Sequence, residues 1–298
     1  VTDLDWTRPW EELRDGRGCS MCKNKKGSSY KDTFESFKNK EFAIRYLDVR
    51  NSNLCNFECV MCNSYYSSKW AERTFKPKKF INYDYEFDMS EVRKIYFAGG
   101  EPMLHKTHWN ILDELVSDEK YFTENIGLIY STNLSLVGDA LHYWPKFSHI
   151  FVNASLDGIG HFGEQLRPGL DWEKFERNIN LIKDLDNVEI EIACTVTCLN
   201  IWHLESLDTW AKNKEIRVKY YPLYHPNYYD ISVLPQELKD RVEWLPDDPD
   251  IKDRFSYNTS HEFRNTIGAV LAGDRLRKTD LWGYLPFEKW AIKNMIDY

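Results

Sequence analysis

Short apolar runs alternate with amphipathic segments along most of the chain, and this pattern predicts a succession of strands and helices. From residue 41 onward, runs rich in β-branched and aromatic residues predict six strands, at 46–51, 94–98, 126–131, 149–156, 188–198 and 216–221. Segments with apolar residues at helical spacing predict helices between them, at 64–74, 107–117, 140–147, 171–182 and 201–213.

Strands that alternate with helices are typical of parallel β-α-β units with right-handed crossovers. The pattern therefore predicts an α/β fold with a parallel sheet over residues 41–225. In barrels built this way the reactive groups lie at the carboxyl ends of the strands. Residues 1–40 precede the pattern and are expected to form a separate N-terminal extension.

The last quarter of the chain, residues 226–298, predicts a helical segment that packs back on the strands. Helices are expected at 235–245 and 259–272, with an acidic turn at 246–250 between them. Thr259 and Glu262 have the spacing of a capping box, which would open the second helix.

Composition narrows the class of protein. The 298 residues are 42% hydrophobic, which is enough for a sizeable core. The net charge of −8 argues against a nucleic-acid or anionic membrane surface, and no apolar run reaches membrane-spanning length. Seven cysteines, three of them within eight residues, suit metal binding in a reducing compartment better than a disulfide framework. The cytoplasm is the expected location, without a membrane or nucleic-acid partner.

Three cysteines follow the first predicted strand at C-x3-C-x2-C spacing: Cys55, Cys59 and Cys62. Thiolates this close in sequence can wrap one inorganic centre. Ordinary iron–sulfur and structural zinc sites take four protein ligands, and no fourth cysteine or histidine lies nearby. A [4Fe–4S] cluster on three cysteines would leave one iron free to bind another molecule. The alternatives are three small buried apolar residues, or half of a zinc site that is completed elsewhere.

A second motif stands at the end of the strand predicted at 94–98, where Gly99, Gly100, Glu101 and Pro102 follow one another. Glycines let the backbone approach a ligand closely, and Glu101 offers an acceptor for an ammonium group.

The two motifs, in this order on consecutive strand–loop units, resemble the radical S-adenosylmethionine (SAM) superfamily. The resemblance implies a partial (β/α)6 barrel with a [4Fe–4S] cluster on the three cysteines. It implies that the free iron binds the amino and carboxylate groups of SAM and that the segment 99–102 binds the amino group. Reductive cleavage of SAM would give a 5′-deoxyadenosyl radical that abstracts a hydrogen from substrate, with flavodoxin or ferredoxin as electron donor. Met61 departs from the aromatic residue that many members carry before the third cysteine.

Weaker resemblances concern the later strands. The segments 153–158 and 167–169 resemble peptide-modifying members, which implies that Ser155 lies near SAM and that Arg167 pairs with its carboxylate. The segment 195–200, with Val196, resembles the part of the family that contacts adenine through the backbone. A strand-end capping role for Ser155 and a surface ion pair for Arg167 remain alternatives.

Cys19 and Cys22 form a C-x2-C pair ahead of the predicted barrel. The pair resembles the twitch or SPASM-like extensions that hold auxiliary clusters, and this implies a second iron–sulfur cluster. Free thiols or a zinc-knuckle remnant are the alternatives. Further cysteines that usually lie upstream are absent, as expected if the chain begins inside the extension.

Substrate is expected over the cluster, between the carboxyl ends of the strands and the two terminal segments. Candidate contacts, for each of which packing is an equal alternative, are Tyr130, Asn133, Tyr221, Tyr224 and His225. The resemblance to the twitch-bearing branch favours a peptide or protein side chain as substrate. A small metabolite such as a sugar or amino-acid derivative comes second, and a non-catalytic zinc module is the alternative from another class.

Overall fold

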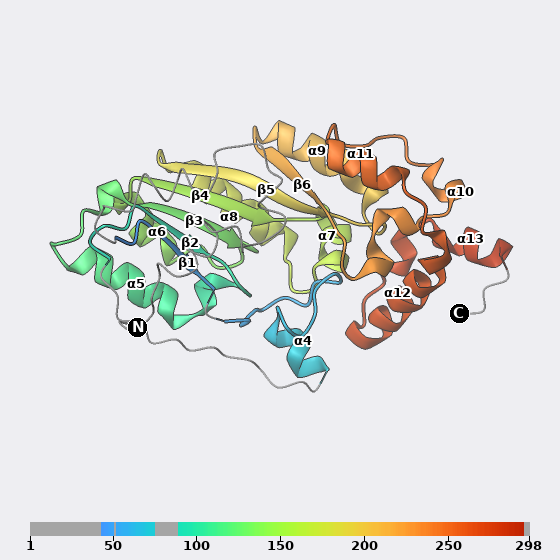
Figure 1. The fold of residues 1–298 in the computed structure, drawn as a ribbon, viewed down its shortest axis with the longest axis horizontal. Helices are drawn as coiled ribbons and strands as arrows, with labels where there is room; N and C mark the ends of the chain where they lie inside the picture. The colour runs from blue at the N-terminus through green and yellow to red at the C-terminus, as the bar shows by residue number, and fades with distance from the viewer. Residues whose placement is uncertain (1–42, 51, 75–88, 295–298) are drawn as a thin grey trace, which may run out of the picture. The chain divides into compact units, whose positions relative to one another are not determined.

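A six-stranded parallel sheet is the centre of the computed structural model, which describes residues 43–50, 52–74 and 89–294. The strands lie side by side in chain order (Figure 1). They are β1 (Tyr46–Val49), β2 (Lys94–Phe97), β3 (Gly127–Thr132), β4 (His149–Ser155), β5 (Val188–Val196) and β6 (Arg217–Pro222). Each pairs in parallel with the next, and no pairing between β1 and β6 is recorded in the described part of the chain. The predicted α/β fold with a partial barrel is confirmed.

The two faces of the sheet differ in burial because successive side chains of a strand point to opposite faces. The covered face, defined by Ile95, Leu128, Ile150 and Ile192, is fully buried. The open face is defined by Tyr96, Ser131, Asn153, Ser155 and Tyr221, all of which are half-buried or exposed.

Helices connect the strands and also follow the last one (Figure 1). The helices between strands turn an apolar face to the interior. Examples are Leu112 and Leu115 on α5 (Lys106–Ser117) and Phe175, Ile179 and Ile182 on α8 (Trp172–Lys183). The helices are α4 (Ser68–Arg73), α5 (Lys106–Ser117), α6 (Ala140–Tyr143), α7 (Gly160–Leu166), α8 (Trp172–Lys183), α9 (Leu204–Asn213), α10 (Gln236–Lys239), α11 (Pro249–Ser256), α12 (Phe263–Arg277) and α13 (Phe287–Lys293).

The helix predicted at 235–245 is wrong beyond its first turn, because α10 ends at Lys239. The Nζ atom of Lys239 donates to the carbonyl oxygens of Phe255 (2.7 Å) and Tyr257, so this side chain links α10 to the end of α11. The predicted acidic turn contains the start of α11. Asp248 accepts from the backbone of Asp250 as its cap, and a proline occupies its first turn.

The capping box predicted at Thr259 and Glu262 is also wrong. The hydroxyl of Thr259 lies 2.8 Å from that of Ser232, and it does not cap the following turn. The carboxylate of Glu262 accepts from Asn265 Nδ2 instead. A tertiary contact thus takes the hydroxyl that the local pattern assigned to the helix end, and α12 begins at Phe263.

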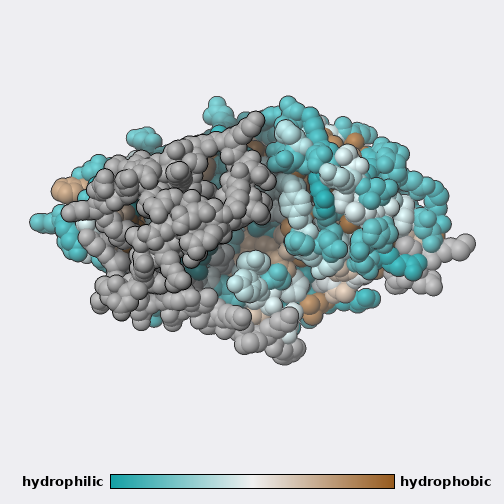
Figure 2. Space-filling view, viewed as in Figure 1, coloured by the Kyte–Doolittle hydropathy of each residue, from teal (hydrophilic) through white to brown (hydrophobic). Residues whose placement is uncertain are grey.

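The described residues from Arg45 onward belong to one compact unit. The surface over α10 to α12 is mostly hydrophilic (Figure 2). Among the described residues, no helix is both long and apolar enough to cross a membrane. Cys19 and Cys22 lie outside the described residues, and the domain boundaries at 40 and 225 stay predictions.

Candidate active site

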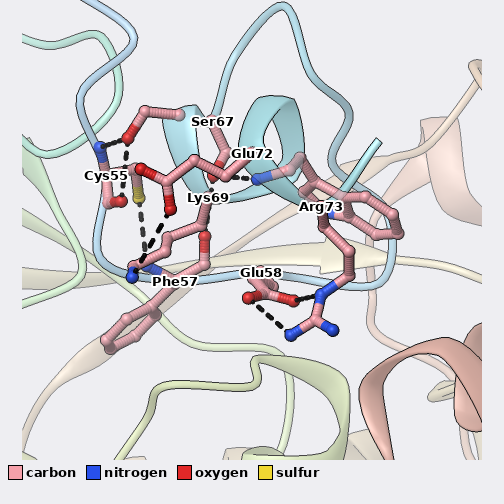
Figure 3. A network of polar contacts seen from close by, with 9 residues as sticks. Cys55, Phe57, Glu58, Ser67, Lys69, Glu72 and Arg73 are labelled. Carbon is pink, nitrogen blue, oxygen red and sulfur yellow. Dashed lines mark hydrogen bonds and ion pairs between the residues drawn. The ribbon is translucent and has the colours of Figure 1, made fainter. Parts of the chain in front are cut away.

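The loop from Cys55 to Cys62 follows β1 and rests on the first turn of α4 (Figure 3). The hydroxyl of Ser68 accepts from Cys55 N (3.1 Å), and the hydroxyl of Ser67 donates to Phe57 O (2.8 Å). Ser67 also caps α4, so one side chain fixes both the helix start and the loop. This explains why the helix begins at Ser68 and not at 64 as predicted.

A salt bridge fastens the same loop from its solvent side. The two carboxylate oxygens of Glu58 accept from Nε and Nη2 of Arg73, the latter at 2.9 Å (Figure 3). Arg73 Nη1 donates to Leu276 O at the end of α12 (2.9 Å). One guanidinium therefore connects the cysteine loop, α4 and the C-terminal helical segment.

Gly99 and Gly100 allow the end of β2 to lie directly against the cysteine loop. Gly100 N donates to Ser52 O (3.0 Å), and Glu101 N donates to Leu54 O (2.7 Å). A Cβ on Gly100 would lie 2.3 Å from Leu54 O, and Gly99 has a φ of +119°. Only glycine fits this close backbone approach, so the pair joins the two predicted motifs into one structure.

The segment from Leu166 to Gly169 lies on the other side of the loop. Glu58 N donates to Pro168 O (2.8 Å) and Val60 N donates to Leu166 O (2.9 Å). Gly169, with a φ of +111°, leaves room for the ring of Phe57, from which a Cβ would be only 2.7 Å away. The cysteine loop is thus held between two glycine-containing segments.

The three cysteines of the loop are half-buried free thiols. Burial raises the pKa of Cys55 to about 11 and that of Cys62 to about 12. Burial also raises the pKa of Cys59, while the nearby Arg167 guanidinium acts in the opposite direction. Thiols in this environment need a metal centre to hold them as thiolates at neutral pH.

The carboxylate of Glu101 points into the protein. Its oxygens accept from Thr132 Oγ1 (2.8 Å), Asn133 N (2.7 Å) and Met103 N (3.4 Å), and the residue is 1% exposed. Burial raises its pKa to about 7, although these hydrogen bonds act in the opposite direction. This carboxylate holds the end of β3 to the end of β2, and its role as acceptor for a ligand's ammonium stays a prediction.

Comparison with known proteins identifies the family of this chain. Residues 51–207, more than half of the chain, match the family described as the radical SAM superfamily. The chain belongs to the radical SAM superfamily. The match covers the cysteine loop, both glycine-containing segments and the strands β2 to β5.

Individual relatives of this radical SAM protein are distant. An uncharacterized protein of Methanocaldococcus jannaschii is 24% identical over 68% of this chain and 67% of its own length. A probable GTP 3′,8-cyclase of the same organism is 25% identical over 67% of this chain and 68% of its own. The solved structure of anSMEcpe with bound AdoMet and the Cp18Cys peptide is similar with a TM-score of 0.46 and 21% identity, over 63% of this chain. This chain spans 55% of that structure's length.

Enzymes of this superfamily use a [4Fe–4S] cluster and SAM, and the cysteine loop fits such a cluster. It offers three thiols that no disulfide or other cysteine claims among the described residues. Within the described ranges, no three His, Cys, Asp or Glu side chains converge closely enough for a single metal ion. A four-iron cluster places each thiolate on a different iron and so accepts a wider spacing.

The structure contradicts the prediction that Tyr130 lines the substrate mouth. Tyr130 is fully buried on the covered face of β3, its hydroxyl lies 2.9 Å from His108 Nε2, and its ring stacks on Phe97. The prediction failed because aromatic residues near a strand end suit both a mouth and a core, and only the strand's register decides between them.

Asn133 is also largely buried, at the cysteine loop. Its Nδ2 donates to Asn56 Oδ1 (2.8 Å), and its Oδ1 accepts from the backbone N (3.0 Å) and the hydroxyl of Ser135. These side chains border a cavity of about 160 Å³ between the loop and α8. These bonds support a role for Asn133 in positioning the cysteine loop, and its contact with substrate stays a prediction.

The three candidates from β6 and its exit are exposed. Tyr221 is 46% exposed on the open face, and Tyr224, 51% exposed, lies 5.3 Å from the guanidinium of Arg254. His225 is exposed as well. No recorded hydrogen bond or ion pair within the described residues joins these three to the cysteine loop, so their contact with substrate stays a prediction.

Ser155 and Val196 lie on opposite faces of the sheet. Ser155 ends β4 on the open face, on the side where SAM is expected. Val196 is fully buried, and its carbonyl accepts from Leu223 N (3.0 Å). Both roles stay predictions.

Sequence reasoning missed most of the residues that line a cavity of about 480 Å³ at the end of β2. Gly99 and Gly100 border it together with residues of β2, β3 and the segments after β1, namely Arg50, Ser52, Asn53, Tyr65, Tyr66, Tyr96, Ala98 and Ser131. The hydroxyl of Tyr96 lies 2.7 Å from that of Ser131. Strand parity relative to apolar Ile95 and Leu128 was the signal that could have found Tyr96 and Ser131.

Proposed function

We propose that this radical SAM enzyme holds its cluster on Cys55, Cys59 and Cys62 and abstracts a hydrogen from a peptide or protein side chain bound on the open face. When bound, the cluster and SAM supply the electron and the 5′-deoxyadenosyl radical. The protein's task is to orient both partners and to exclude water from the radical.

The observation that carries this proposal is the cavity shared by the cofactor motif and the open face. Gly99 and Gly100, which the family resemblance assigns to SAM, border the same 480 Å³ space as Tyr96 and Ser131. A radical must form within contact distance of its target hydrogen. A cavity continuous from the glycines to the open face meets this requirement.

The charges of the cavity favour a peptide over a nucleoside triphosphate. Arg50 is the single cation among the described lining residues, and its Nε already donates to Asp48 Oδ1 (2.8 Å). Phosphate groups generally require several unpaired donors or cations. Tyrosine rings and hydroxyls suit a peptide side chain and its backbone better.

A small metabolite is the second candidate, and the relative named as a probable GTP 3′,8-cyclase favours it. Deuterium transfer separates the two classes. Extract from the encoding organism grown in deuterated medium would be divided by size, and each fraction incubated with enzyme, SAM and dithionite. We expect deuterated 5′-deoxyadenosine from the peptide and protein fraction. Transfer from the small-molecule fraction alone would contradict the peptide proposal.

The cluster assignment has its own test. Anaerobically reconstituted protein is expected to hold about four irons at this loop and to release 5′-deoxyadenosine from SAM after reduction. Cys59→Ala should remove both properties. Cys194→Ala is the matched control, because Cys194 is a buried cysteine of β5 that lies outside the loop. If the Cys55, Cys59 and Cys62 triple variant kept this iron, the proposal would fail.

Two further elements belong to the proposal. Cys19 and Cys22 would hold an auxiliary cluster, and a double alanine variant should then lose iron beyond that of the loop. Equal iron in variant and parent would favour free thiols or zinc.

A flavodoxin or ferredoxin is the expected electron donor, and reduction of the reconstituted cluster by purified flavodoxin tests it.

A further inference from the structure

Arg167 lies opposite Cys59 where the segment 166–168 pairs with the cysteine loop. The backbone bonds from Glu58 to Pro168 and from Val60 to Leu166 flank these two residues. Because the bonded residues run in opposite directions, Cys59 and Arg167 stand face to face. Arg167 Nη1 donates toward Cys59 Sγ at 3.8 Å.

A buried carboxylate holds this guanidinium in place. Arg167 Nε lies 2.6 Å from Asp157 Oδ2, and the two residues are 9% and 1% exposed. The contact is an ion pair between two buried charges. The other oxygen, Oδ1, accepts from Thr195 N (2.7 Å), which fixes the carboxylate to β5.

The arrangement differs from the surface ion pair considered for Arg167. Burial of two charges is costly, and it is tolerated where geometry and further hydrogen bonds compensate. Here the compensation comes from Thr195 on one side and from a cluster thiol on the other. The pair therefore brings an oriented cation to a thiol that the proposed cluster uses.

We propose that Arg167 is a positioning residue that donates a hydrogen bond to the Cys59 thiolate and thereby raises the reduction potential of the cluster, with Asp157 as its anchor. The inference rests on the proposed cluster. An added electron increases the negative charge on cluster and thiolates, and a donor at the sulfur stabilises that charge. Without the Arg167 donor the cluster should be harder to reduce.

The test is a potentiometric titration, followed by electron paramagnetic resonance, of reconstituted protein without SAM. Leaving SAM out separates this role from a bond to the SAM carboxylate. We expect Arg167→Gln to shift the potential to a more negative value and Arg167→Lys to shift it less in the same direction, since lysine keeps the charge and loses the fork. A parent-like potential in both variants overturns the proposal.

Arg254→Gln is the matched control. Arg254 on α11 forms a similar ion pair with buried Asp230, beside β6. The control should lose stability yet keep the parent's potential. A shift in the control as large as that of Arg167→Gln would mean general damage and would overturn the proposal.

Iron content is measured first in every protein. A parent without a cluster would refute the proposed function itself, whereas a loaded parent with unchanged variants refutes only the role of Arg167.

Discussion

The cysteine-loop side of the site and the β6 side are built in opposite ways. On the loop side, Gly100, Glu101, Asn133 and Arg167 all bind other parts of the protein. On the β6 side, the side chains of Tyr221, Tyr224 and His225 are exposed. The contrast indicates that internal contacts fix the cysteine loop, whereas the side chains proposed to contact substrate stay accessible.

The largest expected effect tests the close approach on the loop side. In Gly100→Ala, the new Cβ would lie 2.3 Å from Leu54 O and 2.7 Å from Asn53 C, and backbone atoms cannot move aside cheaply. We expect a loss of about 4 kcal/mol in the free energy of unfolding, with loss of the cluster. Urea denaturation and iron analysis measure both.

Gly138→Ala is its control, since a Cβ there meets nothing within 4 Å. It should keep the parent's stability and iron. Equal behaviour of the two alanine variants would show that the loop tolerates displacement.

A smaller effect concerns the buried carboxylate of Glu101. Its pKa of about 7 in the folded protein exceeds the ordinary 4.5, so the folded state binds its proton more tightly than the unfolded state. This contribution to stability is complete below pH 4.5 and is lost as pH rises to about 7, by about 3 kcal/mol.

Glu101→Gln cannot titrate and should lose this part of the pH dependence. Unfolding midpoints in urea, followed across this pH range, give the slope for parent and variant. Glu124→Gln, at an exposed glutamate, is the control. Parallel slopes for the parent and Glu101→Gln would contradict the raised pKa.

Asn133→Ala should cost about 1–2 kcal/mol in the free energy of unfolding, because it removes the bond to Asn56 and the acceptor of Ser135. Asn153→Ala is the matched control. Asn153 is a half-buried asparagine of the open face for which the described residues show no side-chain hydrogen bond. Comparable stability of both variants in urea would indicate that Asn133 does not fasten the loop.

The smallest effect on stability is expected on the β6 side. Tyr221→Ala and His225→Ala should stay within about 0.5 kcal/mol of the parent because both side chains are exposed. If these residues contact substrate, cleavage of SAM alone will persist while deuterium transfer from substrate falls. Full transfer in both variants would remove the β6 side from the substrate site.

The sequence by itself determined the order of strands, the α/β class and the two motifs, because these depend on local periodicity and residue spacing. The carboxyl ends of the strands shifted by one or two residues, as at β5, which ends at Val196 and not at 198. The helix predicted at 235–245 ended at Lys239, and the capping box failed because a tertiary bond of Thr259 took the hydroxyl that the local pattern assigned to the helix end.

Tertiary structure alone decided where the polar side chains point. The family resemblance predicted that Glu101 and Arg167 belong to the SAM site, but their partners Thr132, Asn133 and Asp157 come from other strands and loops. The same holds for Tyr130, whose register on β3 turns it into the core. A residue's neighbours in space depend on strand register and loop packing, and a single sequence contains these only through long-range contacts that no local pattern records.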